Sequence, residues 1–422
     1  MASEETSAGV RFAQEFNSRA KTIETGTHHA LFIKSPLFGA TAGGVCSPSQ
    51  FLHVWRLDPP PVTARSRFGS AEFAGPNRQS NKGSVLNLFA GEPFLWETTI
   101  PAGELELHSK LVLPLGEPPF PAVVLVHGSG ADSAVDTYFM PYLFAAHGIA
   151  TLVYDKRGTG GSTGTYNQNF YLLSDDTVAA AEWLRDRPEI DPNLVHLAGY
   201  SQGGWIAPLA ASKSDAINSL LINYGPMVPI TEEDRWGYRY VLQQKGFGDD
   251  ALAEADRINE VLSLIFDHSE DRWDELGVLL DEAEGTDWFK TVTGSDSMLG
   301  FVGETKMPMW MARLYYKWMT RGDEVFVDRL YDPFPVVAKL DNPSLWIFGD
   351  QDSSIPSADS IDKLEILRQQ GRPIDVEIFP RAEHGILLFE GDDPFDRRYL
   401  GYAPGYLDLQ VSWLRQQSGL TP

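Results

Sequence analysis

Cysteine, basic residues and long apolar runs are all scarce in this chain of 422 residues. Cys46 is the only cysteine, which excludes an internal disulfide and a metal site built from several cysteines. Lys and Arg number 34 against 58 Asp and Glu, which gives a formal net charge of -24. A surface of this charge repels nucleic acids and anionic membranes. We therefore expect neither of them as a partner.

Apolar residues are spread along the chain rather than gathered in one segment. No stretch approaches the roughly 18 apolar residues that a membrane-spanning helix needs. The opening residues, MASEETSAGVRFAQEF, lack the basic start and the apolar run of a signal peptide. Hydrophobic residues still make up 43% of the chain, enough for a sizeable core. We expect a soluble, cytoplasmic protein, and the composition leaves a homo-oligomer open.

Strand-like and helix-like segments alternate over much of the chain. Residues 1–92 are irregular, with Pro and Gly clusters, and we interpret them as an N-terminal extension that packs on the main domain rather than as a separate binding module. From residue 93, a strand pair precedes an alternation that predicts an α/β fold, with a mostly parallel sheet and helices on both faces. The expected strands cover residues 94–100, 104–113, 122–126, 149–154, 194–200, 217–224, 344–348 and 374–379.

The alternation stops after Gly225, and a long helical segment rich in aromatic residues follows. We interpret it as a cap inserted between two strands of one sheet, and we expect both of its ends to lie above the carboxyl edge of that sheet. Plain hydrophobic packing and a dimer contact are the alternatives. If it is a cap, Trp310 and Trp318 are the aromatic residues that we place in the substrate pocket. The expected layout is an extension at 1–92, core at 93–226, cap at 227–335 and core at 336–422.

Two stretches match the pattern G-x-S-x-G, centred on Ser162 and Ser201. Chance alone gives such a match in roughly one chain in seven of this length, so the context must decide. A nucleophilic serine on a sharp turn needs a strand directly before it and a helix directly after it. Ser201 follows the strand-like VHLAGY and precedes the helix-like GGWIAPLAAS, whereas Ser162 lies between two loop-like segments. We therefore predict Ser201 as the nucleophile.

A serine hydroxyl needs a base, and the chain has nine histidines. His384 lies in RAEHGI, in a loop after the last expected strand. Loops at the carboxyl edge of an open α/β sheet are where ligands bind. His196 lies inside a strand, His147 at a helix end and His268 in an acidic run, so each of them more simply packs or faces solvent. We predict His384 as the base.

A tetrahedral oxyanion needs backbone N–H donors. The N–H of Gln202, at the start of the helix after Ser201, is one expected donor. The other should come from the loop HGSG, whose glycines let the backbone approach a substrate closely. We favour the N–H of Ser129 there, with Gly130 as the alternative, and we expect His127 to support the loop.

Five motifs follow one another in the chain: HGSG, YDKRGTGGSTG, GYSQGGWIAPLAA, FGDQDSSIP and AEHG. Over residues 97–224 and 343–414 they resemble α/β-hydrolase serine esterases, in the branch that includes serine aminopeptidases and dienelactone hydrolases. The resemblance implies the α/β-hydrolase fold and hydrolysis of a carboxylic ester through an acyl-enzyme, with no metal or organic cofactor. In such proteins Asp155 and Arg157 of the DKRG turn usually have a structural role.

Two carboxylates, Asp350 and Asp352, follow the strand expected at residues 344–348, and either could orient the histidine. The spacing typical of the family is Gly-x-x-Asp-x-x-hydrophobic-Pro, and GDQDSSIP matches it with Asp352. The order Ser201, Asp352, His384 along the chain is also that of the family. The resemblance therefore favours Asp352 over Asp350.

The expected substrate is an ester of a neutral, hydrophobic or aromatic small molecule. An aromatic cap would form a partly apolar roof over the site, and burial of apolar surface selects apolar groups. The acidic residues of the insertion would then face solvent. An acyltransferase, thioesterase, peptidase or C–C bond hydrolase would use the same triad and stays an alternative. A non-catalytic binding protein is a remote one, because no triad member is missing.

Overall fold

The computed structural model describes residues 94–421, with gaps at 268–269, 294–296, 305–307, 320–328 and 392–395. All of these residues belong to one compact unit, Pro36–Pro422. The extension expected at residues 1–92 and the side chain of His268 lie outside the described residues.

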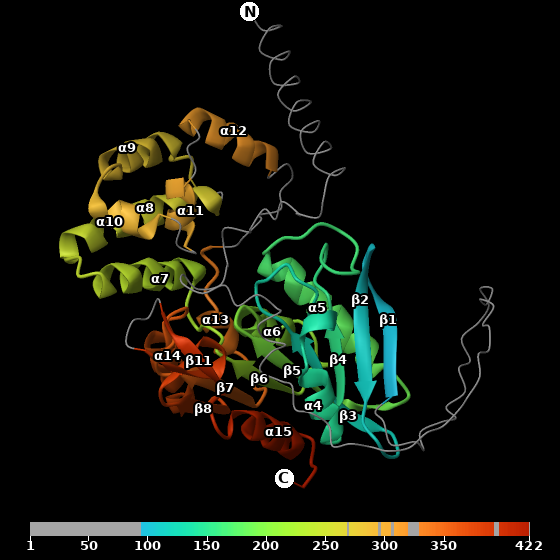
Figure 1. The fold of residues 1–422 in the computed structure, drawn as a ribbon. Coiled ribbons are helices and arrows are strands. Elements are labelled where there is room, and N and C mark those ends of the chain that lie inside the picture. Colours follow the sequence, from blue (N-terminus) through green and yellow to red (C-terminus); the bar gives the residue numbers. More distant parts are fainter. Residues whose placement is uncertain are drawn as a thin grey trace, which may run out of the picture. The chain divides into compact units, whose positions relative to one another are not determined.

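One sheet of eight strands organises the described part of the chain, in the order β1-β2-β4-β3-β5-β6-β7-β8 (Figure 1). β1 and β2 form an antiparallel hairpin, β2 is antiparallel to β4, and every further pairing is parallel. This confirms the predicted fold class. The strands are β1 (Phe94–Ala102), β2 (Leu105–Leu113), β3 (Phe120–Val126), β4 (Ala150–Tyr154), β5 (Ile190–Tyr200), β6 (Ser219–Asn223), β7 (Ser344–Gly349) and β8 (Ile374–Phe379).

Helices cover both faces of this sheet because its central strands are apolar on both sides. Along β3, Val123 and Leu125 pack in one buried cluster and Val124 and Val126 in another, as the two-residue period of a strand requires. The first cluster includes side chains of α4 (Met140–Ala146) and α15 (Tyr406–Gln417). The second includes side chains of α5 (Phe170–Arg185), α6 (Gly203–Ala211) and α14 (Ser357–Gln369).

Two helices begin earlier than the sequence pattern predicts. The sequence pattern predicts helices at residues 174–187 and 360–370. α5 starts at Phe170 because the side chain of Asn169 caps it by accepting from the N–H of Leu172. α14 starts at Ser357, directly after a proline. A small three-stranded sheet, of β9 (Ala382–Glu383), β10 (Leu387–Glu390) and β11 (Arg398–Tyr402), was not predicted.

A helical insertion lies between β6 and β7. Its first residues are tied to the sheet domain, because the indole N–H of Trp205 in α6 donates to the carbonyl of Val228 at 2.7 Å. Lys363 of α14 also pairs with Glu232 of the insertion at 3.3 Å. Its helices are α7 (Ile230–Gln244), α8 (Asp249–Phe266), α9 (Trp273–Ala283), α10 (Asp287–Val292), α11 (Met298–Glu304) and α12 (Met309–Met319).

The two ends of the insertion lie side by side near the carboxyl edge of the sheet, as expected. The N–H of Thr231 donates to the carbonyl of Arg329 at 3.3 Å, and Tyr331 packs against Phe170, the first residue of α5. β6 and β7 are parallel neighbours, so a chain that leaves the carboxyl end of β6 must return to the amino end of β7. The return runs through α13 (Phe334–Val337), which packs against α6. The insertion therefore starts and ends near the edge where Ser201 emerges, and the segment after it makes the crossover to β7.

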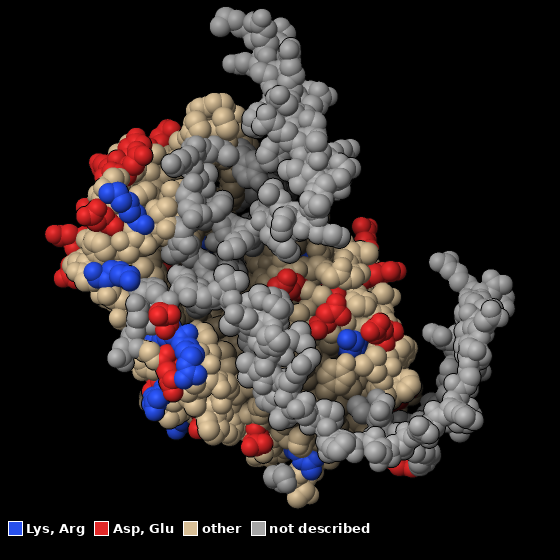
Figure 2. Space-filling model, in the orientation of Figure 1, with Lys and Arg blue, Asp and Glu red and all other residues tan. Residues whose placement is uncertain are grey.

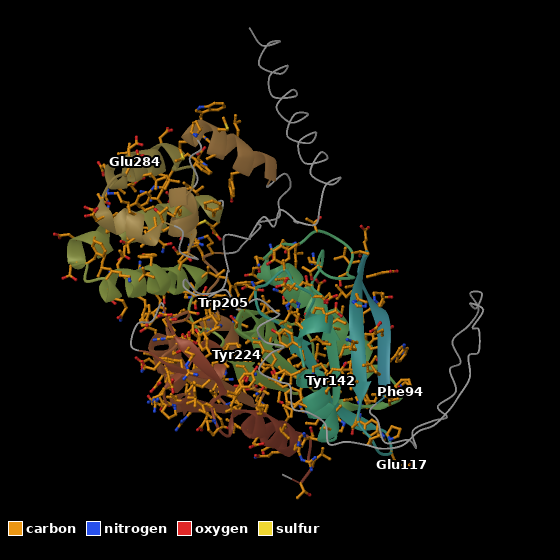
Figure 3. The ribbon with its side chains drawn as sticks, in the orientation of Figure 1. Phe94, Glu117, Tyr142, Trp205, Tyr224 and Glu284 are labelled. Atoms are coloured by element: carbon orange, nitrogen blue, oxygen red, sulfur yellow. The ribbon has the colours of Figure 1, made fainter. Side chains whose placement is uncertain are left out.

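A buried arginine holds the first two helices of the insertion together. Arg329 is fully buried and pairs with Asp234 of α7 at 2.6 Å, while it also donates to Asn259 and Ser263 of α8. The outer surface is acidic, as expected: Figure 2 shows acidic side chains over α9, and Glu284 lies at the far end of the insertion in Figure 3. None of the helices in the described part of the chain is both long and apolar enough to span a lipid bilayer.

Candidate active site

Ser201 sits on a sharp turn between β5 and α6. Its φ of 52° lies in the left-handed region, which costs free energy for any residue with a Cβ. Two glycines make the turn sterically feasible. A Cβ on Gly199 would lie 2.5 Å from the carbonyl oxygen of Gly203, and a Cβ on Gly203 would lie 2.3 Å from that of Val126. The motif G-x-S-x-G therefore follows from the packing around this turn.

The structure brings Ser201, His384 and Asp352 together in one chain of hydrogen bonds. Nε2 of His384 lies 3.1 Å from Oγ of Ser201, and Nδ1 of the same ring lies 2.9 Å from Oδ2 of Asp352. A neutral imidazole with its proton on Nδ1 donates to Asp352 and accepts from the hydroxyl of Ser201. The Asp352 side chain is fully buried, whereas the His384 side chain is 24% exposed. This geometry allows the serine hydroxyl to pass its proton to the imidazole.

The two candidate carboxylates have different partners. Oδ1 of Asp352 accepts from the N–H groups of Ser354 and Ile355, which leaves Oδ2 directed at the imidazole. Asp350 instead accepts from the N–H of Arg381 at 2.6 Å, which closes the turn between the segments after β7 and β8. The geometry thus places Asp352 beside His384 and Asp350 in a structural turn.

Two residues that the sequence reasoning missed hold His384 in place. Oε1 of the buried Glu383 accepts from the N–H of His384 and from both the N–H and the hydroxyl of Ser353, so it links the histidine loop to the aspartate loop. Tyr224, labelled in Figure 3, directly follows β6. Its ring packs edge-on against the imidazole of His384, with ring centroids 4.8 Å apart. The carboxylate next to His384 in the motif AEHG was the available signal for Glu383.

The two segments that carry the expected oxyanion donors meet at Ser201. Gly128 approaches Ser201 so closely that a Cβ on it would lie 3.5 Å from the Cβ of Ser201. Within the part of the chain that the structure describes, the backbone N–H groups of Ser129 and Gln202 donate to no other residue. Both donors are therefore available to a ligand, as an oxyanion hole requires.

Ser162 is the second match to the serine pattern, and its hydroxyl forms hydrogen bonds within a turn. Its hydroxyl donates to the carbonyl of Asp155 at 2.7 Å and accepts from the backbone N–H of His108 at 2.8 Å. The carboxylate of Asp155 binds the His108 ring, Ser133 and two backbone N–H groups. The imidazole of His108 is thus directed at Asp155 rather than at the serine hydroxyl.

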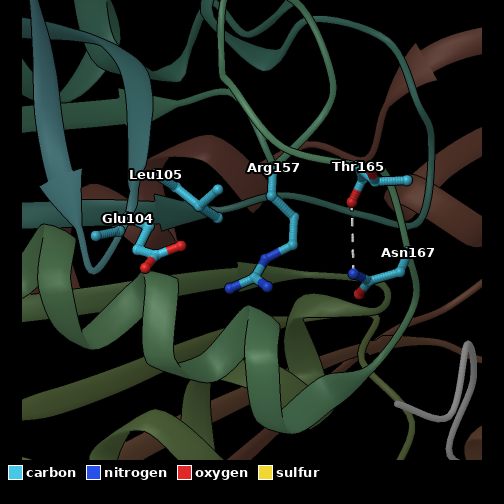
Figure 4. Close-up of a pocket in the computed structure, with 6 residues that line it drawn as sticks. Glu104, Leu105, Arg157, Thr165 and Asn167 are labelled. Atoms are coloured by element: carbon cyan, nitrogen blue, oxygen red, sulfur yellow. Dashed lines mark hydrogen bonds between the residues drawn. The ribbon is translucent and has the colours of Figure 1, made fainter. Parts of the chain in front are cut away.

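A cavity of about 370 Å³ beside the β1–β2 turn does not belong to this site (Figure 4). It is lined by Ala102, Glu104, Leu105, Arg157, Thr165 and Asn167, none of which contributes to the hydrogen-bond chain of Ser201. Its arginine is already bound, since the guanidinium of Arg157 forms two hydrogen bonds of 2.8 Å with Asp176.

Of the two aromatic side chains predicted for the substrate pocket, the structure describes one, that of Trp310. Trp310 is 63% exposed and lines a groove of about 390 Å³ between α9 and α12, together with Trp273 and Met309. In the described part of the chain, no hydrogen bond or ring contact joins Trp310 to Ser201 or His384. The side chain of Trp318 lies outside the described residues.

Parts of this chain are similar to known proteins. Thiohydrolase aneE of Aspergillus aculeatus is 32% identical over 129 residues, 30% of this chain and 40% of that protein. Esterase EstD of Thermotoga maritima is 30% identical over 172 residues, 38% of either chain. The chain thus spans about two fifths of the length of these curated relatives.

One solved structure and one family model match larger shares of the chain. The alpha/beta hydrolase GrgF from Penicillium sp. sh18 is 18% identical, with a TM-score of 0.48, over 78% of this chain and 99% of that one. A family model described as "Alpha/beta hydrolase family" matches residues 123–397, more than half of the chain and the stretch that contains Ser201, Asp352 and His384. The chain therefore belongs to the alpha/beta hydrolase family.

Proposed function

We propose that the protein is a serine hydrolase that cleaves a carboxylic ester through an acyl-enzyme. The observation that carries the proposal is the unbroken hydrogen-bond chain from Oγ of Ser201 through the imidazole of His384 to Oδ2 of Asp352. The exposed edge of that imidazole and the unused N–H groups of Ser129 and Gln202 support it. An arrangement of this kind performs acyl transfer on several unrelated folds.

In the proposed reaction, Oγ of Ser201 attacks the acyl carbon while Nε2 of His384 takes the hydroxyl proton. The carbonyl oxygen becomes an oxyanion, held by the N–H groups of Ser129 and Gln202. The intermediate collapses, and the imidazolium gives its proton to the leaving alcohol. Water, deprotonated by His384, then attacks the acyl-serine, releases the acid and restores the hydroxyl. The sequence of steps requires no metal or organic cofactor.

The substrates we propose are neutral and apolar or aromatic small molecules. The formal net charge of -24 disfavours anionic substrates at long range. On the helical insertion, Asp274, Asp281, Glu282 and Glu284 are exposed, whereas its aromatic residues Trp273 and Trp288 are buried. Apolar side chains of the insertion that contact the substrate would favour apolar groups.

A thioester is the second candidate substrate class. A thioester carries the same acyl carbon and carbonyl oxygen, so the nucleophile and the oxyanion donors serve it equally. The match to a protein named thiohydrolase is the observation that favours it. Comparing the hydrolysis rates of matched esters and thioesters decides between an oxygen and a sulfur leaving group.

A serine-reactive fluorophosphonate should label the protein, and the purified protein should hydrolyse p-nitrophenyl esters. A panel of neutral esters and matched thioesters of graded acyl length gives kcat/KM for each leaving group. Neutral apolar esters should react faster than esters that carry a carboxylate of similar size. Absence of both labelling and hydrolysis would refute the proposed function, whereas a preference for anionic esters would refute only the substrate class.

Replacing Trp310 by alanine should change KM more than stability. The side chain is 63% exposed, so its removal costs little core packing. Loss of about 50 Å² of apolar contact with a substrate corresponds to roughly a tenfold rise in KM. Tyr142→Ala is the matched control, since Tyr142 is an aromatic residue on α4 that is 44% exposed. Identical KM values and identical substrate ranking in the two variants would remove Trp310 from the pocket.

A further inference from the structure

A lysine is buried directly behind the expected oxyanion donors. Lys156 follows β4 in the sequence YDKRG and is only 2% exposed. Its Nζ donates to the carbonyl oxygen of Gly128 and, at 2.7 Å, to Oε1 of Gln202. One ammonium group thus contacts both segments from which the oxyanion donors come.

The contact with Gly128 acts on the N–H of Ser129, because the two groups belong to one peptide unit. A trans peptide is planar, and its C=O and N–H point in opposite directions. Holding the carbonyl of Gly128 on the Lys156 side therefore directs the N–H of Ser129 to the opposite side. Donation from a cation also polarises the peptide and strengthens its N–H as a donor.

Two glutamines complete the connection between the two segments. Nε2 of Gln202 donates to Oε1 of Gln168, a fully buried residue. Nε2 of Gln168 donates in turn to the carbonyl of Ser129 at 2.9 Å, and the hydroxyl of Tyr166 donates to the same carbonyl. Lys156 therefore holds the peptide before Ser129. Gln168, which is itself bound by Gln202, holds the peptide after Ser129.

The charge of Lys156 has no counter-charge in the part of the chain that the structure describes. Its neighbour Asp155 is occupied by His108, Ser133 and backbone N–H groups, and the adjacent Arg157 is paired with Asp176. Nδ1 of His127 donates to the same carbonyl oxygen of Gly128 that Lys156 contacts, at 3.2 Å. Buried cations are normally paired, so an unpaired one calls for an explanation.

We propose that Lys156 is a positioning residue of the oxyanion hole, and that the oxyanion of the acylation step is the counter-charge it lacks. The proposal rests on the serine-hydrolase function above. It assigns to Lys156 no contact with substrate: the lysine acts through the Gly128–Ser129 peptide and through Gln202. The charged form of Lys156 is the active one, because only it attracts the developing negative charge.

A pH dependence follows from this arrangement. Burial disfavours the ammonium and lowers the pKa of Lys156 to about 7. Above that pH the lysine is neutral in the folded protein, so kcat/KM should fall as the pH rises from 7 to 9. Stability should move the other way, because the unfolded chain binds one more proton than the folded one between this pKa and the ordinary lysine value. Activity and stability should therefore change in opposite directions over one pH range.

Lys156→Met tests the inference, since methionine keeps much of the buried volume and removes the charge. We expect kcat/KM for a neutral ester to fall about 10- to 100-fold at pH 6.5, less than the loss of a whole oxyanion donor, and mainly through kcat. The alkaline decline of the wild-type profile should vanish in this variant. Lys110→Met is the matched control: Lys110 is also buried and also donates to a backbone carbonyl, that of Val135, and it should keep the wild-type rate and profile.

Three outcomes would overturn the inference. The first is a wild-type profile that does not decline between pH 7 and 9, a measurement that needs no variant to fold. The second is a folded Lys156→Met protein with wild-type rate. The third is an alkaline decline that persists in Lys156→Met, which would assign it to another group such as Glu233, whose pKa is raised by burial and by nearby Asp234 and Asp352. Loss of fluorophosphonate labelling in Ser201→Ala separates these results from a failure of the proposed function itself.

Discussion

Replacing Ser201 by alanine is expected to lower kcat by on the order of 10⁴- to 10⁶-fold while the protein stays folded. The variant loses the only protein atom that the proposed mechanism bonds to the acyl carbon, so the acyl-enzyme cannot form. Alanine removes one oxygen from a partly exposed side chain, and the turn backbone is held by the N–H of Ser201 on the carbonyl of Asn223 at 3.0 Å. Ester hydrolysis, fluorophosphonate labelling and thermal unfolding, all measured on the same preparation, check the result.

Ser162→Ala is the matched control for this variant. Ser162 has the same sequence pattern around it, but its hydroxyl is hydrogen-bonded within the Asp155 turn. Its loss should lower the unfolding temperature rather than the rate of labelling. Labelling that survived Ser201→Ala and disappeared in Ser162→Ala would show that the nucleophile is misassigned.

Asp352→Asn is expected to lower kcat by roughly 10²- to 10⁴-fold, with a smaller effect on KM. The amide keeps the size of the carboxylate but loses the charge that stabilises the imidazolium. It can also present an N–H to Nδ1 of His384, which favours the wrong tautomer of the ring for accepting the Ser201 proton. Steady-state kinetics on a neutral ester, at a pH where the wild type is fully active, measures the loss.

Asp350→Asn provides the comparison, because both residues follow β7 and both carry a carboxylate. Asp350 binds the N–H of Arg381 and no atom of His384, so its substitution should affect stability more than kcat. If Asp350→Asn costs more in kcat than Asp352→Asn, the acid of the triad has been assigned to the wrong residue.

Much of the fold could be predicted because the central strands are buried on both faces and therefore appear as continuous apolar runs. Residues 149–154 and 344–348, for example, lie within a residue or so of the bounds of β4 and β7. The three short strands β9, β10 and β11 could not be predicted in this way. The longest has five residues, and most of their side chains are partly exposed, so they lack an apolar period.

The chain of Ser201, His384 and Asp352 was accessible from sequence because each residue stands in a short motif at a strand end. The residues that position them were harder to find. Gln168 is 34 residues from Gln202, and Lys156 is 28 residues from Gly128; only the parallel register of β3, β4 and β5 brings these segments side by side.

The parallel pairing of β6 and β7 also has an evolutionary consequence. Parallel neighbours always need a crossover, so residues 224–343 enlarge a connection that the sheet requires in any case. Each doubling of a connection costs only about 0.6 kcal/mol in closure entropy. Descendants of a common ancestor can thus lengthen, shorten or exchange this segment while the register of the strands, and with it the catalytic machinery, is inherited unchanged. New specificities can be acquired by recombination at this one place.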